Sequence, residues 1–172
     1  MRKNVVWITL DSVRADHTSM SGYERDTTPN LLRISCESEG ANFENCIAHS
    51  HYTHPSSGAI LTGKPPSRNT VGYTGESVPD GVPTVAEMFR DTGYHTACIS
   101  RNSYLSPATK LDRGFDDFEW ISSSTIHKVG MRTILKYLLN LRRHSAGFSL
   151  DTAEYSTPYL MNDIAKRWLS SF

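Results

Sequence analysis

Short apolar runs along the chain predict three buried β-strands. Residues 4–10 form an apolar, β-branched run, and residues 41–48 have Phe43 and Ile47 as apolar anchors. Residues 95–100 form the third run. Short apolar runs of this kind are typical of strands in a parallel sheet.

Helical segments alternate with these runs. A cap followed by proline predicts a helix over residues 26–39, which Gly40 ends, and a proline start predicts another over residues 83–90. A strand, helix, strand order predicts an α/β fold with a parallel sheet and right-handed crossovers.

A third helix is predicted over residues 53–63, directly after the second strand. Pro55 suits its first turn and Gly63 its C-terminal end. Thr53 then lies at a helix N-terminus, where unpaired N–H groups and the helix dipole favour an anion. A hydroxyl there can attack a phosphorus or sulfur centre. The alternative is a threonine that only caps a buried helix.

The last fifty residues show two helical patterns. Residues 126–143 predict a basic amphipathic helix that either covers the core or lies on a membrane surface. Leu160, Ile164 and Trp168 repeat every fourth position and predict an apolar stripe on a final helix, with Pro158 restarting or kinking it.

Composition narrows the class of protein. The 172 residues include 18 Lys+Arg and 18 Asp+Glu, so the net charge is +0 and gives no argument for nucleic acid. No run is long enough to span a bilayer, and the N-terminus lacks a cleavage site for a signal peptide. We therefore expect a cytoplasmic protein without a transmembrane segment, whose three cysteines are buried free thiols.

Asp11 follows the first predicted strand, at the edge where α/β sheets bind ligands. Its carboxylate is a candidate ligand for a hard cation, and a turn-capping role is the alternative.

The order of short motifs then resembles the N-terminal portion of the sulfatase family, in the alkaline phosphatase superfamily. The matching segments lie roughly within residues 3–120: residues 10–17, 22–23, 28–31, 53–56, 61–63, 83–86, 93–97 and 114–116. Each is short, but the series in register is a stronger signal than any one motif.

This resemblance implies a fold and a domain plan. The fold is an α/β, three-layer α/β/α sandwich with a mostly parallel sheet, alkaline phosphatase-like and truncated. Residues 1–172 would be the N-terminal part of one domain, with a matching core at 1–120, a variable basic helix and linker at 121–150, and an amphipathic helix at 151–172.

The resemblance also implies chemistry. Thr53 occupies the nucleophile position, and Asp11 with Ser12 occupies the site of a divalent metal (Ca, Mg, Mn or Zn). Thr53 cannot be matured to formylglycine, as a Cys or Ser is in sulfatases, so the resemblance is closer to Thr-nucleophile phosphodiesterase and phosphoglycerol-transferase members. Ser57 replaces the Arg, and Ser12 the second Asp, that the family usually carries.

Four residues are candidates for contact with a small anionic ester: Arg101, Asn102, Lys64 and His54. The family's Lys-Trp-His sequence is absent after the third strand, so Arg101 would supply the cation and Asn102 a hydrogen bond. For all four, an ordinary loop role is the alternative.

Two functions remain open at this point. The first is a metal-dependent hydrolase of sulfuric or phosphoric esters that is incomplete alone, since the later metal ligands of the family do not appear. A separate chain could complete its site. The second is a non-catalytic remnant or binding module with the same half-fold.

Overall fold

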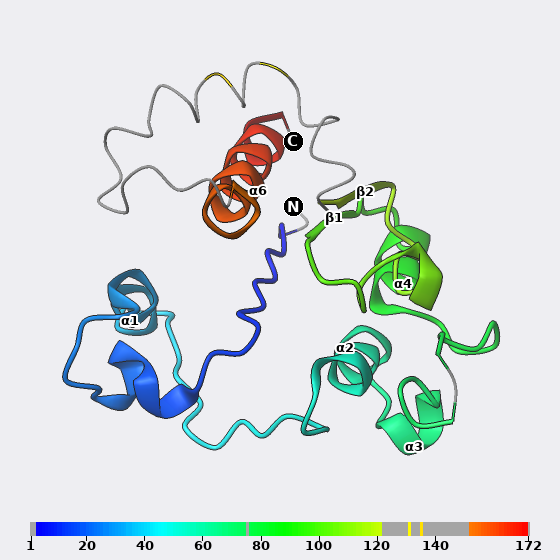
Figure 1. Ribbon diagram of the computed structural model, residues 1–172, viewed down its shortest axis with the longest axis horizontal. Helices are drawn as coiled ribbons and strands as arrows, with labels where there is room; N and C mark the ends of the chain where they lie inside the picture. The colour runs from blue at the N-terminus through cyan, green and yellow to red at the C-terminus, as the bar shows by residue number, and fades with distance from the viewer. Residues whose placement is uncertain (1–2, 75, 122–130, 132–134, 136–151, 172) are drawn as a thin grey trace. The chain divides into compact units, whose positions relative to one another are not determined.

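The computed structural model describes residues 3–74, 76–121, 131, 135 and 152–171. They group into two compact units, residues 1–48 and 49–172 (Figure 1), and each is described by itself. The predicted basic helix of residues 126–143 falls almost entirely outside the described residues. No helix in the described part is long and apolar enough to cross a membrane.

The first unit is built from short helical turns. Its elements are η1 (Ala15–His17), η2 (Ser19–Ser21) and α1 (Pro29–Ser35). The Ser19 amide donates to Thr28 Oγ1 at 2.9 Å, and the Thr28 amide donates to Ser19 Oγ at 2.8 Å. This reciprocal pair fastens η2 to the start of α1. The predicted helix therefore forms, but over a shorter span than residues 26–39.

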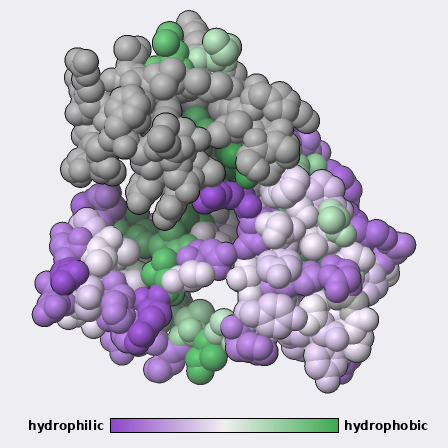
Figure 2. All heavy atoms as spheres, viewed as in Figure 1, coloured by the Kyte–Doolittle hydropathy of each residue, from purple (hydrophilic) through white to green (hydrophobic). Residues whose placement is uncertain are grey.

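Both strands predicted in the first unit are wrong for the described residues. Residues 4–10 and 41–48 have no strand pairing, and the side chain of Trp7 is 72% exposed. A strand is stable only when a neighbour accepts its backbone hydrogen bonds. Hydrophobic side chains accordingly remain at the surface, some of them visible as green patches in Figure 2.

The second unit contains the remaining elements. They are α2 (Thr53–Thr62), α3 (Pro66–Asn69), α4 (Val85–Asp91), β1 (Ala97–Ser100), η3 (Pro107–Thr109), β2 (Asp117–Trp120) and α6 (Thr152–Ser171). β1 and β2 pair in parallel, with Ala97 opposite Asp117 and Ser100 opposite Trp120. The helices together with this parallel pair of strands confirm the expected α/β class.

Two motifs of the family resemblance hold this sheet together. Thr96 Oγ1 donates to the Gly114 carbonyl, and the Asp116 carboxylate accepts the Thr96 amide at 2.9 Å. Gly114 has φ +88°, and a Cβ there would lie 2.2 Å from the Glu87 amide nitrogen. Only glycine therefore lets the chain pass this close to the first turn of α4 before it enters β2.

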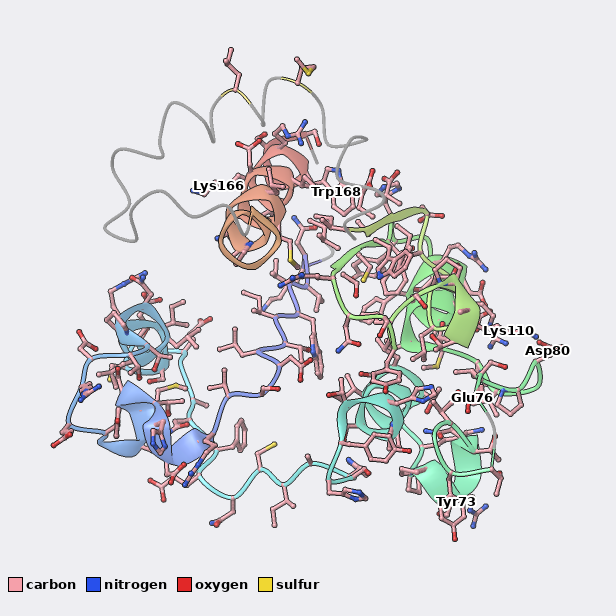
Figure 3. The ribbon with its side chains drawn as sticks, viewed as in Figure 1. Tyr73, Glu76, Asp80, Lys110, Lys166 and Trp168 are labelled. Carbon is pink, nitrogen blue, oxygen red and sulfur yellow. The ribbon has the colours of Figure 1, made fainter. Side chains whose placement is uncertain are left out.

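Two apolar clusters form the core of the second unit. Val71, Val78, Val82 and Leu111 are buried together, with Leu61 of α2 packed against them. The other cluster joins α6 to the sheet: Leu160 and Ile164 are buried against Ile121, with Ile99 of β1 and Trp168 beside them. This confirms the predicted stripe at Leu160, Ile164 and Trp168. Trp168 is labelled on α6 in Figure 3.

Candidate functional site

Helix α2 carries the candidate nucleophile in its first turn. Thr53 is the first helical residue, and Pro55 lies in the same turn, as the sequence predicts. Gly63 ends the helix with φ 64°, also as predicted. The N-cap is Tyr52, whose side chain makes no cap hydrogen bond. A tyrosine cannot cap as Ser or Asp does, so the N-cap supplies no side-chain oxygen to the first-turn amides.

His54 fixes the start of α2 to two loops. The residue is only 3% exposed, and its ring stacks on Tyr104 with the ring centroids 4.7 Å apart and the planes 13° from parallel. Nε2 lies 3.0 Å from the Glu76 carbonyl. A carbonyl only accepts, so Nε2 carries the hydrogen. His54 is thus packed between the segment before α4 and the loop after β1.

That second loop carries two of the predicted substrate contacts. Arg101 is exposed directly after β1. The Asn102 amide donates to Ser100 Oγ at 3.1 Å, and Asn102 Oδ1 accepts the Tyr104 amide at 2.8 Å. Because Tyr104 stacks on His54, this turn brings the loop of Arg101 and Asn102 to the N-terminal end of α2.

Lys64 does not lie at the N-terminal end of α2 with Thr53. It follows Gly63 at the C-terminal end of α2, and ten helical residues separate it from Tyr52, about 15 Å at 1.5 Å per residue. Its carbonyl accepts the side-chain amide of buried Asn69 at 2.8 Å, while its side chain is exposed. The structure thus separates Lys64 from Thr53, and a contact with substrate there remains only a prediction.

A cavity of about 380 Å³ lies beside the first turn of α2. Tyr52 Oη donates a hydrogen bond to the Gly72 carbonyl. Gly72 has φ +66°, and a Cβ there would lie 2.7 Å from Pro55 Cδ. Glycine at position 72 is therefore what allows the loop to approach α2 and form one wall of the cavity.

The candidate metal ligands lie in the first unit. Asp11 and Ser12 are exposed, and Ser12 Oγ lies 3.5 Å from Asp11 Oδ1. Ser12 has φ 58°, which non-glycine residues adopt infrequently. A carboxylate and a hydroxyl are the hard oxygen donors that Ca²⁺, Mg²⁺ and Mn²⁺ prefer, but such ions take about six.

The described residues add no further metal cluster. Within them, no three His, Cys, Asp or Glu side chains gather in a way that could hold a metal ion. The donors at Asp11 and Ser12 fit a hard cation in kind and fall short in number. The meeting of Asp11 with Thr53 stays a prediction, since the two residues belong to different units.

Sequence reasoning missed the residues that assemble this region. Glu76 and Tyr104 contact His54, and Tyr52 lines the same cavity, yet none of the three lies in a recognisable motif. The missed strand β2 did have a signal, because Asp117–Trp120 alternates polar and apolar residues as a strand does.

Nearly the whole chain matches a known protein family. The sulfatase family model matches residues 3–167. An arylsulfatase of Clostridium perfringens is 37% identical over 107 residues, which are 59% of this chain and 21% of that protein. An N-acetylglucosamine-6-O-sulfatase of Bacteroides thetaiotaomicron is 30% identical over 129 residues, or 75% of this chain and 22% of that protein.

A shorter match is to a protein named as a transferase and not as a sulfatase. Phosphatidylethanolamine transferase Mcr-1 of Escherichia coli is 39% identical over 51 residues, 30% of this chain and 9% of that protein. No solved structure matches the chain. The chain spans between a fifth and a quarter of the length of the two sulfatases, at 21% and 22%.

Proposed function

The chain belongs to the sulfatase family, and from this premise we propose that it supplies the nucleophile side of a hydrolase of sulfuric esters. The observation that carries the proposal is the stacking of His54 on Tyr104 at 4.7 Å. It supports a site in which Thr53, at the start of α2, meets the loop that holds Arg101 and Asn102. A hydroxyl, a guanidinium and a carboxamide on neighbouring elements suit an anionic ester.

In the proposed reaction Thr53 Oγ1 attacks the sulfur atom. The new bond joins Thr53 to sulfur, the bond from sulfur to the alcohol oxygen breaks, and the alcohol leaves with a proton. Water then attacks the same sulfur, releases sulfate and restores the hydroxyl. Arg101, the Asn102 carboxamide and the first-turn amides of α2 hold the sulfate oxygens as charge develops on them.

A divalent metal is part of the proposal. Asp11 and Ser12 would supply two of its oxygen ligands, and other ligands would have to come from outside the described residues or from a separate chain. Such an ion, when bound, lowers the pKa of the attacking hydroxyl and neutralises the anion. The identity of the metal and a cytoplasmic location stay predictions from the sequence.

Phosphoric esters are the alternative substrates for the same attack by Thr53. The threonine at position 53 and the match to a phosphatidylethanolamine transferase support it, but that match covers 51 residues only. Two longer matches are to proteins named as sulfatases. The proposal therefore takes sulfate esters as the main substrates and phosphodiesters as the second class to test.

A non-catalytic binding module is the second candidate function. It is favoured by the two-oxygen donor set at Asp11 and Ser12 and by the replacement of the family's usual Arg by Ser57. A module of this kind would bind an anion at α2 without turnover.

A purified-chain assay separates the candidates. Hydrolysis of an aryl sulfate and of an aryl phosphodiester is measured with added Ca²⁺, Mg²⁺, Mn²⁺ or Zn²⁺, for the natural chain and for Thr53→Ala. The hydrolase predicts metal-stimulated turnover that Thr53→Ala reduces at least 100-fold. Thr92→Ala removes a hydroxyl from the exposed end of α4, where it bonds the Phe89 carbonyl at 2.8 Å, and it should retain the natural rate.

The same assay can contradict the proposal. Equal rates in the natural chain and Thr53→Ala would exclude Thr53 as the nucleophile. Saturable binding of inorganic sulfate without turnover under any metal would favour the binding module instead.

A further inference from the structure

His54 lies at the meeting point of three segments of the second unit. It belongs to the first turn of α2, its ring stacks on Tyr104 of the loop after β1, and its Nε2 donates to the Glu76 carbonyl at 3.0 Å. Glu76, labelled in Figure 3, comes from the loop between α3 and α4. One side chain therefore joins α2 to two loops that are distant from it in the sequence.

The two loops are also bonded to each other. The amide of Val78, two residues after Glu76, donates to the Thr109 carbonyl at 3.1 Å, and Thr109 Oγ1 donates to the Tyr104 carbonyl at 2.9 Å. Val78 is fully buried in the apolar core of the second unit. Together with the contacts of His54, these bonds form a closed ring that is anchored in the core, so no member can move far without breaking one of them.

This closed ring includes the neighbours of the candidate site residues. Tyr104 comes two residues after Asn102 and three after Arg101, and its amide donates to Asn102 Oδ1 at 2.8 Å. Thr53 directly precedes His54. The stack of the histidine on the tyrosine is thus a direct contact between the start of α2 and the loop that carries the candidate cation.

The burial of His54 suits support of its neighbours better than contact with a ligand. The residue is only 3% exposed, Tyr104 covers one face of its ring, and the Glu76 carbonyl occupies Nε2. Tyr104 itself is 42% exposed, so the tyrosine is the partner that meets solvent. A side chain locked by packing on one side and by a hydrogen bond on another can hold reacting groups in a fixed geometry.

We propose that His54 is a positioning residue for the reaction. Through its stack with Tyr104 it holds the loop after β1 where attack by Thr53 on sulfur requires that loop. The inference rests on the proposed function and adds to it a residue that acts without touching the ester. A displacement of about 1 Å at a reacting group can cost on the order of 100-fold in rate. Loss of the stack should therefore lower kcat far more than it raises KM, because the loop is needed most as charge develops on the sulfate oxygens.

Kinetics of single and double variants test the inference, with an aryl sulfate and added metal. His54→Gln and Tyr104→Ala should each lower kcat about 30-fold and change KM by less than about threefold. The double variant should lose no more than either single one, because both changes break the same contact. Tyr104→Phe keeps the stacked ring and should restore kcat to within about twofold of the natural chain. Tyr94→Ala breaks the ring pair with Phe89 of α4, whose centroids lie 5.1 Å apart, and is the matched control with unchanged kcat.

Binding of inorganic sulfate separates this inference from the proposed function. If the natural chain shows no turnover, the dissociation constant for sulfate replaces kcat, and it should rise about threefold in His54→Gln and in Tyr104→Ala, without further loss in the double variant and with recovery in Tyr104→Phe.

Several results would overturn the positioning role and leave Thr53 as the nucleophile. They are additive losses in the double variant, equal losses in Tyr104→Phe and Tyr104→Ala, or a raised KM with unchanged kcat. Tyr104 is 42% exposed, so its variants should fold and decide the question even if His54→Gln does not. A natural chain that neither turns over aryl sulfate nor binds sulfate would overturn both proposals.

Discussion

Among the described residues, the carboxylate whose pKa is lowered most is Asp16, four residues after Ser12 of the candidate metal pair. Arg14 lies 2.6 Å from one of its oxygens and His17 lies 3.1 Å from the other. Hydrogen bonds from Arg14 first and His17 second lower the pKa of Asp16 from 3.8 to about 2. A lowered carboxylate pKa contributes stability above the unfolded value and loses it as pH falls, here between about pH 4 and pH 2.

Removing the guanidinium should reverse this shift. In Arg14→Gln the pKa of Asp16 should return most of the way to 3.8, as followed by NMR titration of the carboxyl carbon. Arg33→Gln removes the exposed partner of Glu37 instead and should leave Asp16 titrating near 2. An Asp16 pKa that stays near 2 in Arg14→Gln would contradict the assignment to Arg14.

The cysteines should differ in reactivity. Burial raises the pKa of the Cys98 thiol to about 12, whereas Cys36 and Cys46 are exposed, so the prediction of buried thiols is wrong for these two. Because only the thiolate is nucleophilic, about one Cys98 in 10⁴ is reactive at pH 8. Iodoacetamide at that pH should label two cysteines in the folded chain and three in urea, as counted by mass spectrometry. Rapid labelling of Cys98 in the folded chain would refute this.

At the residue scale, the sequence predicted the site in part. Pro55 and Gly63 were enough to place Thr53 at a helix start, because backbone preferences at helix ends are local. The role of His54 was not predictable, because its partners, Glu76 and Tyr104, lie 22 and 50 residues along the chain. Contacts at such separations depend on tertiary packing and leave no local pattern.

At the scale of the elements, α4 begins with a full capping box formed by Thr84 and Glu87. Thr84 is 1% exposed; its hydroxyl accepts the Glu87 amide at 3.1 Å and donates to the Arg113 carbonyl at 2.8 Å. Thr84→Ala loses both bonds and should lower the free energy of unfolding by about 1–2 kcal/mol. Urea denaturation measures the change, and Thr84→Ser, which keeps the hydroxyl, should lose clearly less. Equal losses in the two variants would show that packing, not the cap, dominates.

Helix α6 offers a matched pair of substitutions. Ile164 is 5% exposed against the sheet and Leu169 is 63% exposed. Ile164→Ala should cost about 2–5 kcal/mol of unfolding free energy, because it leaves a cavity in the core. Leu169→Ala should stay within about 0.5 kcal/mol. Similar effects of both variants in denaturant unfolding would mean that α6 does not dock on β1 as described.

Elements were predictable where their signals are local. The start and end of α2 follow from Pro55 and Gly63, and α4 lies within two residues of its predicted bounds, whereas α1 ends at Ser35, before its predicted end at residue 39. The strands at residues 4–10 and 41–48 were predicted from apolar composition, but a strand also needs a partner for its backbone, and composition does not name that partner. β1 forms because Thr96 fastens Asp116 and thereby the start of β2.

At the scale of the whole molecule, the family and the α/β class were both readable from motif order. The sulfatase model spans residues 3–167, well beyond the motifs that suggested it. The division of the described residues after Ala48 was not predicted, because no linker composition marks it. Net charge of +0 gave no guide to the partner.

The exposed side chain of Trp7 makes the optical signals of the two units separable. Of the three tryptophans, Trp7 belongs to the first unit and is 72% exposed, whereas Trp120 and Trp168 are half-buried in the second. Dissolved iodide collides with exposed indoles, so it should extinguish the emission of Trp7 first. The fluorescence that remains then reports on the sheet and α6 alone, and equal quenching of all three indoles would show that Trp7 is covered in solution.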